Sequence, residues 1–194
     1  MSITSTKTQR LTMIAIFSAI SFGLMLFPQL PLIPGADFLK LDFSIVPILM
    51  AGYWINMSAA IWTIVLRTLL KLILANEGIN TYLGMPVNFL VVITFTIVIF
   101  LVMPNFEPQN WLKNIFAIIV ATISMTIVAV LVNWFVAVPL YANFAHFDIA
   151  KFIGLGKYFV SMVIPFNLVE GIIWGAVTFV ILSILKPLQQ KISF

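Results

Sequence analysis

The stretch Phe38-Leu39-Lys40-Leu41-Asp42-Phe43-Ser44-Ile45-Val46-Pro47 places a lysine, an aspartate and a serine between two long apolar runs. Those flanking runs have the character of lipid-embedded helices. A charged side chain inside a bilayer costs at least about 2.5–3.5 kcal/mol, so a charge beside such helices is a candidate functional group. The stretch therefore predicts a site at the membrane surface, at the start of an apolar helix.

The composition is that of an integral membrane protein. The 194 residues are 62% hydrophobic and 8% charged, and the mean hydropathy is +1.16. A soluble domain carries about 25% charged residues. We expect one transmembrane domain over residues 1–194, which leaves no room for a soluble ATPase. The net charge of +4 suits anionic lipid headgroups better than nucleic acid.

The sequence offers no constellation for catalysis or for metal binding. It has no cysteine and a single histidine, His146, and it lacks the Gly-rich, HExxH and GxSxG motifs of nucleotide-binding and hydrolytic enzymes. We therefore expect no catalytic residue, no metal site and no enzymatic activity.

The apolar runs predict an all-α protein with six transmembrane helices. A helical span needs about 20 mostly apolar residues. The expected helices cover residues 9–27, 43–56, 58–75, 83–103, 112–140 and 162–186. The second is short, and the fifth is longer than a bilayer requires, so it tilts or extends beyond the membrane.

Basic residues near the two ends predict the orientation. Lys7 and Arg10 precede the first helix, and Lys186 and Lys191 follow the last. The positive-inside rule then places both termini in the cytoplasm. Three loop lysines oppose this assignment, because they would lie outside: Lys40, Lys151 and Lys157.

Polar residues inside the expected helices lie at a similar depth. Arg67 and Lys71 share a face of the third helix, Asn133 lies in the outer part of the fifth, and Asn167 and Glu170 share a face of the sixth. Such groups face the bundle interior or a water-filled cavity. Their common depth predicts an outward-facing polar pocket.

Each of these residues also has a purely structural interpretation. Arg67 and Lys71 can extend to the outer headgroups. Glu170 can form an ion pair with Arg67, and Asn133 and Asn167 can hydrogen-bond between helices. The pattern alone leaves these alternatives open.

Aromatic residues adjoin both asparagines. Trp134 follows Asn133, and Phe166 precedes Asn167. An aromatic ring beside an amide suits a planar heterocycle, which needs both stacking and hydrogen bonds at its edge.

Small residues follow one face of the first helix. Ala15 and Ala19 are four residues apart, a spacing that allows another helix to approach closely. The pattern is common in apolar helices, so packing within the bundle is an equally good interpretation.

Several motifs together resemble one transporter family. They are the stretch from Phe38 to Pro47, Val87-Asn88-Phe89-Leu90, Asn133-Trp134-Phe135 with Pro139-Leu140-Tyr141, and Ile164-Pro165-Phe166-Asn167-Leu168-Val169-Glu170-Gly171. In this order and spacing they are similar to the riboflavin-specific S components of energy-coupling factor (ECF) transporters. The resemblance covers nearly the whole chain.

The resemblance implies a six-helix S component in the prokaryotic plasma membrane, with both termini cytoplasmic. Such proteins capture a vitamin on the outside and deliver it with a transmembrane coupling subunit and two cytosolic ATPases. Riboflavin would be the transported ligand, and no cofactor is implied. Ala15 and Ala19 look like the surface that docks on the coupling subunit.

The resemblance also directs attention to the ligand pocket. Asn133 and Asn167 look like the amides that hydrogen-bond the flavin ring, and residues 39–44 look like part of the pocket wall. Together with the polar helix residues, this gives ten expected substrate-binding residues: Leu39, Lys40, Leu41, Asp42, Ser44, Arg67, Asn88, Asn133, Asn167 and Glu170.

Two positions depart from the family pattern. Position 170 is usually a lysine and here is Glu170, which replaces a hydrogen-bond donor by an acceptor. The asparagine of the fourth helix usually follows an acidic residue, whereas Met85-Pro86 stands here. Either Arg67 balances the charge of Glu170, or the ligand is another vitamin such as pantothenate. A different kind of function is also open: the chain could be a scaffold subunit of a membrane complex that binds no ligand.

Overall fold

A computed structural model describes residues 7–36 and 38–191 of the chain, with side chains described up to residue 189. The charge of Lys191, used above for the orientation, therefore lies outside the described side chains. The described residues are mostly helical. The elements are α1 (Lys7–Leu26), β1 (Leu30–Pro31), β2 (Lys40–Leu41), α2 (Ile45–Trp54), α3 (Met57–Leu74), α4 (Ile79–Val102), α5 (Trp111–Val132), the π turn η1 (Asn133–Ala137), α6 (Val138–Phe144), α7 (Ile149–Phe152), α8 (Leu155–Tyr158), the π turn η2 (Phe159–Val163) and α9 (Ile164–Lys191).

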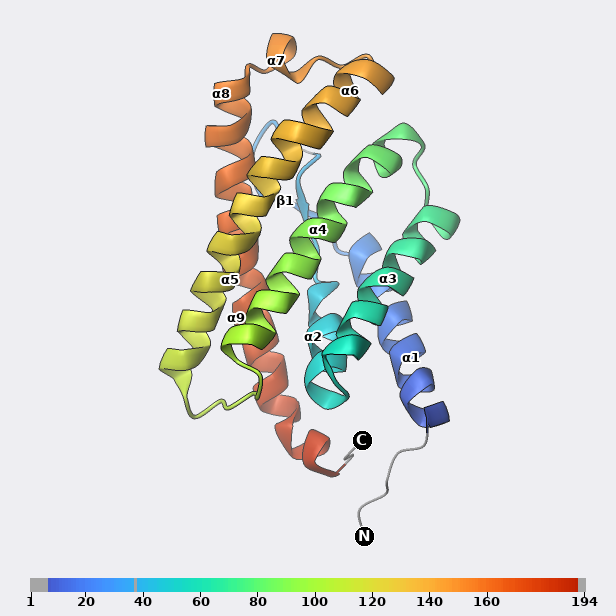
Figure 1. Cartoon of the computed structure of the whole chain (residues 1–194), viewed down its shortest axis with the longest axis vertical. Helices are drawn as coiled ribbons and strands as arrows, with labels where there is room; N and C mark the ends of the chain where they lie inside the picture. The colour runs from blue at the N-terminus through green and yellow to red at the C-terminus, as the bar shows by residue number, and fades with distance from the viewer. Residues whose placement is uncertain (1–6, 37, 192–194) are drawn as a thin grey trace.

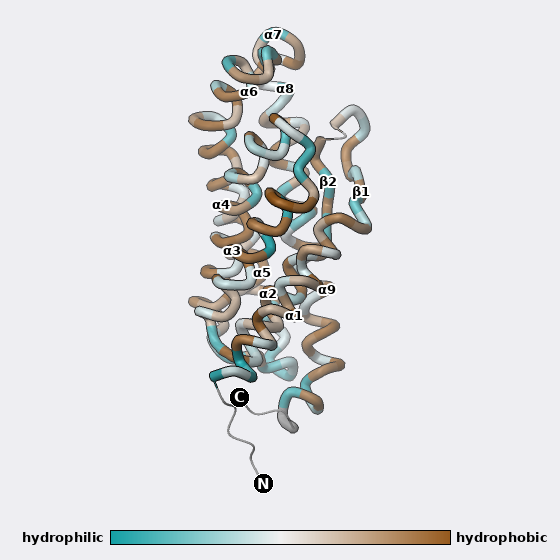
Figure 2. Tube along the Cα trace, turned by 90° about the vertical axis from the view of Figure 1, so that its right-hand side faces the viewer, coloured by the Kyte–Doolittle hydropathy of each residue, from teal (hydrophilic) through white to brown (hydrophobic). Residues whose placement is uncertain are grey.

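Five helices within the described ranges are long and apolar enough to cross a membrane. They are α1, α3, α4, the continuous helix Trp111–Phe144 and the continuous helix Leu155–Gln189. The apolar helix α2 is shorter, at ten residues. Figure 2 shows hydrophobic residues along most of the length of these helices.

One sequence-based boundary and one expected loop need correction. The last long helix begins at Leu155 and not near residue 162, because Gly156 and Lys157 interrupt the apolar run without ending the helix. The loop after α1 contains a short antiparallel ladder that pairs Leu30 with Leu41, which the sequence did not suggest. The excess length of the fifth helix is confirmed, since it continues through η1 and α6 to Phe144.

The helices run alternately along the long axis of the molecule (Figure 1). The start of α1, the end of α9, the α2–α3 turn and the α4–α5 loop lie at one end. The opposite end carries α6, α7, α8 and the α3–α4 turn. Helix α4 packs against α5, and α5 against α9, while α1 packs against α2 and α3. Helix α2 is enclosed by its neighbours, with most of its residues buried.

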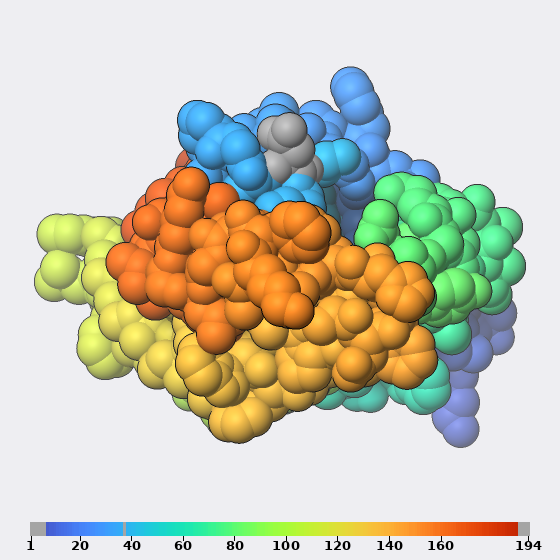
Figure 3. Space-filling view, turned by 90° about the horizontal axis from the view of Figure 1, so that it is seen from above, coloured from blue at the N-terminus to red at the C-terminus, as the bar shows by residue number. Residues whose placement is uncertain are grey.

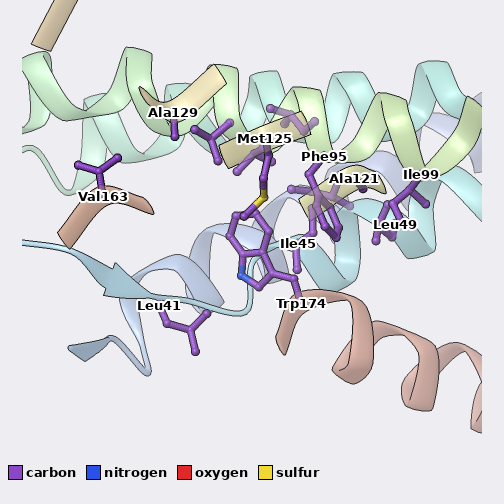
Figure 4. Packing of buried hydrophobic residues seen from close by; sticks show 14 of the residues in the cluster. Leu41, Ile45, Leu49, Phe95, Ile99, Ala121, Met125, Ala129, Val163 and Trp174 are labelled. Carbon is purple, nitrogen blue, oxygen red and sulfur yellow. The ribbon is translucent and has the colours of Figure 1, made fainter. Parts of the chain in front are cut away.

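Close contact between α5 and α9 depends on two glycines. A Cβ atom added at Gly171 would lie 2.6 Å from Thr122 Oγ1, and one at Gly175 would lie 2.5 Å from Ile118 Cγ2. Glycine at this four-residue spacing lets two helix backbones approach closely. Beside this contact, Met125 of α5 and Ile45 of α2 lie next to the indole of Trp174 in the buried core (Figure 4).

Both long helices that carry the expected amides contain a π turn before a proline. The turn η1 begins at Asn133 and is followed by Pro139, and η2 ends at Val163 before Pro165. Proline has no N–H and clashes with the preceding turn of a regular helix. Such π turns often occur at functional sites. Asn133 is the first residue of η1, and Asn167 lies one helical turn after η2, where its Nδ2 donates to the carbonyl of Val163.

Candidate ligand-binding site

A cavity of about 740 Å³ is lined in part by residues from the end of the molecule that carries α6, α7 and α8, among them Tyr141, Ile149 and Tyr158. Three segments meet around this end when it is seen from above (Figure 3): the loop that follows α1, the α3–α4 turn, and α6 to α8. Each contributes to the lining, for example through Phe38, Glu77 and Phe147. A volume of roughly 300–1,000 Å³ is usual for small-molecule sites.

Seven of the ten expected site residues line this cavity. They are Leu39, Lys40, Asp42, Asn88, Asn133, Asn167 and Glu170. The other three, Leu41, Ser44 and Arg67, are fully buried behind it and are not part of its lining. Of the polar helix residues at a common depth, Lys71, Asn133, Asn167 and Glu170 line this cavity, and Arg67 does not.

The backbone between Asp42 and Ser44 joins three helices. The Ser44 N–H donates to Asp42 Oδ1 over 2.8 Å, which closes a local turn at the start of α2. The carbonyl of Ser44 accepts from Ser21 of α1 at 2.7 Å, and Trp174 Nε1 of α9 donates to the carbonyl of Asp42 at 2.8 Å. The polar stretch therefore holds one wall of the cavity in place.

Arg67 connects this wall to α4. Its guanidinium donates from Nη1 to Ser44 Oγ and from Nη2 to Asn88 Oδ1, the latter over 2.7 Å. Arg67 forms no ion pair with Glu170 among the described residues, although its charge interacts electrostatically with both Glu170 and Asp42. The ion pair considered above is therefore replaced by hydrogen bonds to neutral groups.

Asn133 is held from two sides. Its Nδ2 donates to the carbonyl of Ala129 over 2.8 Å, and its Oδ1 accepts from the hydroxyl of Tyr158 over 2.6 Å. The second bond joins η1 to α8, so an interhelical role and a place in the cavity lining coexist in one side chain. Tyr158 also lines the cavity.

Asn167 and Glu170 occupy neighbouring turns of α9. Asn167 Nδ2 donates to the carbonyl of Val163 over 2.8 Å, so its Oδ1 remains available as an acceptor. Glu170 is 5% exposed, and no group in the described part of the chain hydrogen-bonds to its carboxylate. Both side chains line the cavity.

The lining presents a mixed hydrogen-bonding surface to a ligand. The oxygens of Asn88 and Asn133 already accept hydrogen bonds, so these residues can offer a ligand only N–H groups: both of those of Asn88, and the one of Asn133 that does not donate to Ala129. Asn167 and Glu170 supply acceptors. Such a surface suits a ligand with both donors and acceptors on its edges.

An ion pair lies at the mouth of the cavity. Lys71 Nζ is 2.7 Å from Glu77 Oε1, and Lys40 Nζ donates to Gln29 Oε1 over 3.3 Å. The hydrogen bond from Lys71 lowers the pKa of the Glu77 carboxyl below its ordinary value, and the charge of Lys71 adds to this effect. Lys71 is directed to Glu77 in the described structure, so this contact replaces the headgroup contact considered above.

The aromatic neighbours of the two asparagines differ in position. Phe166 lines the cavity, as an aromatic partner for a planar ligand would. Trp134 does not line it; its indole is half exposed and packs on Phe159 with ring centroids 5.3 Å apart. Tyr158 stacks on Phe38 beside the cavity. The sequence interpretation missed Tyr158. Pro139 and Pro165, which follow the two π turns, were visible in the sequence as signs of irregular helix, and Tyr158 directly precedes the second of these turns.

On the outer surface of the bundle, Ala15 and Ala19 are exposed on α1. They lie on the face that turns away from the bundle, because the buried residues of this helix are Phe17, Ser18, Ser21 and Met25. A partner helix would therefore find this face accessible.

Comparison with known proteins confirms the resemblance. Residues 9–182 match the family model of the ECF transporter, substrate-specific component. A protein named riboflavin transporter RibU from Leuconostoc mesenteroides is 64% identical, with 96% of this chain and 95% of that protein covered. A RibU from Streptococcus thermophilus is 44% identical, with coverages of 96% and 87%.

A solved structure described as the S component of a bacterial ECF transporter has the same fold. It superposes with a TM-score of 0.76 at 30% sequence identity, and the match covers 94% of this chain and 98% of that one. The chain therefore belongs to the family of ECF transporter substrate-specific components.

Proposed function

We propose that the chain captures riboflavin in the cavity between α3, α4, α5 and α9 and presents it for import. The observation that carries the proposal is the cavity of about 740 Å³, whose lining includes the helix residues Asn88, Asn133 and Asn167. The relatives named riboflavin transporter, at 64% and 44% identity over nearly the full chain, support the choice of ligand. The chain is a transporter component and not an enzyme.

The proposed topology has six spans with both termini in the cytoplasm of a prokaryotic cell. Support comes from the common end at which α1 begins and α9 ends (Figure 1), and from the basic residues near both ends. Helix α2 would complete the sixth crossing with the polar stretch before it. The cavity would then open to the outside.

The absence of cysteine makes this topology testable by single substitutions. Gln109→Cys lies in the α4–α5 loop and Lys151→Cys in α7, at opposite ends of the molecule, and both positions are exposed. In intact cells a membrane-impermeant maleimide should label Lys151→Cys and spare Gln109→Cys. The reverse pattern would invert the orientation.

The proposed mechanism includes the partners that membership of the ECF family implies. We place a transmembrane coupling subunit on the exposed Ala15 and Ala19 face of α1, with two cytosolic ATPases beneath it. Small residues at this spacing permit close helix approach within the bilayer.

A direct test is the colour of the purified protein. Detergent-solubilised protein that retains flavin should be yellow, and ligand-free protein should bind added riboflavin with quenching of flavin fluorescence. Colourless protein that leaves riboflavin fluorescence unchanged would refute the ligand assignment.

A second candidate is another vitamin, and Glu170 favours it. An acidic residue in the cavity replaces the base usual at this position in the resembling family. Titration with riboflavin, pantothenate, folate and thiamin in parallel separates the two. Binding of none of the four would favour the scaffold alternative.

A further inference from the structure

Helix α4 has a weak point close to its start, at the end of the molecule that carries the α3–α4 turn (Figure 1). Pro86 lies inside the helix, about two turns after its first residue, Ile79. Proline has no N–H, so the carbonyl of Tyr82 lacks the hydrogen bond that a regular helix would give it. Gly84, two residues before the proline, has the least restrained type of backbone. The helix therefore bends most easily between residues 82 and 86.

The part of α4 that follows Pro86 is fixed to the bundle. Asn88 Oδ1 accepts a hydrogen bond from Arg67 Nη2 of α3 over 2.7 Å, and Arg67 is fully buried. Val92 and Phe95, farther along α4, belong to the main buried core. Bending at the proline would therefore move the first two turns of α4 and leave the rest in place.

The first two turns of α4 have no comparable attachment. Leu83 and Met85 are buried, yet neither belongs to the hydrophobic core clusters that the described residues form. The described structure gives residues 79–86 one side-chain hydrogen bond, which Thr81 Oγ1 accepts from the N–H of Glu77 over 2.9 Å. This bond ties the start of α4 to the α3–α4 turn. Residues 76–85 thus form one unit, which we call the α4 flap.

The α4 flap borders the cavity and is joined to α3 by an ion pair. Six of its residues line the cavity: Glu77, Ile79, Asn80, Thr81, Gly84 and Met85. Lys71 Nζ of α3 is 2.7 Å from Glu77 Oε1. The side chain of Lys71 is 7% exposed and that of Glu77 is 71% exposed. The lysine is therefore the fixed partner, and the glutamate can leave it without leaving a packed environment.

We propose that the α4 flap is a gate of the cavity, which bends at Gly84–Pro86 and is held closed by the Lys71–Glu77 pair. Hinges of this kind consist of a few residues that absorb the change in backbone angles. The inference rests on the proposed capture of riboflavin and adds the step by which the ligand enters and leaves.

The rates of riboflavin binding test the gate. Quenching of flavin fluorescence by the purified full-length protein, followed by stopped flow, gives the association and dissociation rate constants. Pro86→Ala restores a helical hydrogen bond at the hinge, so opening would break one bond more. Both rate constants should fall about tenfold while Kd stays the same, because a gate changes access and not the bound state. Pro86 is exposed and does not line the cavity, so its replacement removes no ligand contact.

Pro187→Ala is the matched control. Pro187 is also an exposed proline inside a long helix, but it lies near the end of α9, at the opposite end of the molecule from the α3–α4 turn (Figure 1). Its replacement should leave both rate constants unchanged. Glu77→Gln removes the ion pair and should raise both rate constants. A merely structural role of the pair would lower the Tm without changing either rate.

Hydrogen exchange of backbone amides tests the hinge without a ligand. In the wild type, residues 83–85 should exchange faster than residues 70–72 of α3, which lie at a similar distance along the chain from the same turn. Pro86→Ala should slow the exchange of residues 83–85 about tenfold. Gly84→Ala should act in the same direction, because a Cβ there meets no atom within 4 Å and alanine restrains the backbone. Gly23→Ala, which is equally unobstructed, should have no effect on these residues.

The outcomes are separable. If residues 83–85 exchange no faster than residues 70–72, or if Pro86→Ala leaves their exchange unchanged, the hinge is refuted. If Pro86→Ala slows the exchange but leaves both rate constants at their wild-type values, the segment bends without gating the cavity, and riboflavin capture stands. If the wild type binds no flavin, the proposed function fails, while the exchange comparison still confirms or refutes the hinge.

Discussion

The hydroxyl of Tyr158 donates to Asn133 Oδ1 over 2.6 Å and thereby joins α8 to the π turn η1 beside the cavity. The same amide donates to the carbonyl of Ala129. Asn133 is consequently fixed in orientation before any ligand arrives. Preorganisation of this kind reduces the entropy cost of binding.

Tyr158→Phe should weaken riboflavin binding by about 0.5–1.5 kcal/mol, because it releases the Asn133 amide from one of its two restraints. Fluorescence titration of the purified variant measures the change. Tyr53→Phe is the matched control, since its hydroxyl donates to the carbonyl of Met103 at the opposite end of the bundle. Equal losses in both variants would contradict a local role for Tyr158.

Asn167→Leu should weaken binding by about 1–3 kcal/mol, because a ligand group that meets Oδ1 would be left unpaired. Asn114→Leu is the control: Asn114 is also buried, but it donates to the carbonyl of Glu107, near the α4–α5 loop. Calorimetric affinities of both variants check the prediction. Unchanged affinity in Asn167→Leu would remove this residue from the site.

The Lys71–Glu77 pair should make stability depend on pH. Lys71 lowers the pKa of Glu77 in the folded state, so the stabilisation is complete above the ordinary carboxyl pKa of about 4.3. It is lost as the pH falls through the lowered folded value. Glu77→Gln should therefore lower the Tm slightly near neutral pH, and the difference from wild type should shrink in acid.

Lys71→Met supplies the control for this pH effect. In that background Glu77 has lost its partner, so Glu77→Gln should no longer change the Tm at neutral pH. Persistence of the full difference would mean that Glu77 stabilises the fold by another contact.

Gly175→Ala should destabilise the protein by about 1–3 kcal/mol, because the new methyl group would overlap Ile118 of α5. Gly23→Ala is matched to it, since a Cβ at Gly23 meets no atom within 4 Å. Thermal unfolding in detergent should show a lower Tm for Gly175→Ala and an equal or higher Tm for Gly23→Ala. A tolerated Gly175→Ala would show that α5 and α9 can separate freely.

Bulky residues on the exposed face of α1 should separate transport from binding. Ala15→Trp and Ala19→Trp should abolish riboflavin uptake by cells while the affinity of the purified protein stays within about twofold, as expected for surface changes. Ile16→Trp, on the adjacent exposed position, tests whether the effect is confined to the small residues. Normal uptake in the two alanine variants would exclude this face as the docking surface.

Local features of the sequence were sufficient for the class of the protein and most of its helices. An apolar run long enough to cross a bilayer is helical because lipid offers its backbone no other hydrogen-bond partners. The spacing of Asn167 and Glu170 likewise fixes their common face, since three residues nearly complete one helical turn. The motifs from Phe38 to Gly171 were sufficient for the family.

The tertiary structure alone decided which polar groups meet. Arg67 was a candidate partner for Glu170, yet it donates to Ser44 and Asn88 and leaves the carboxylate to the cavity. Tyr158 and Asn133 are separated by 25 residues in sequence, and their bond exists because α8 packs beside η1. A hydropathy pattern assigns a residue to a helix face, but a hydrogen bond requires two atoms within about 3 Å, and only the packing of whole helices sets that distance.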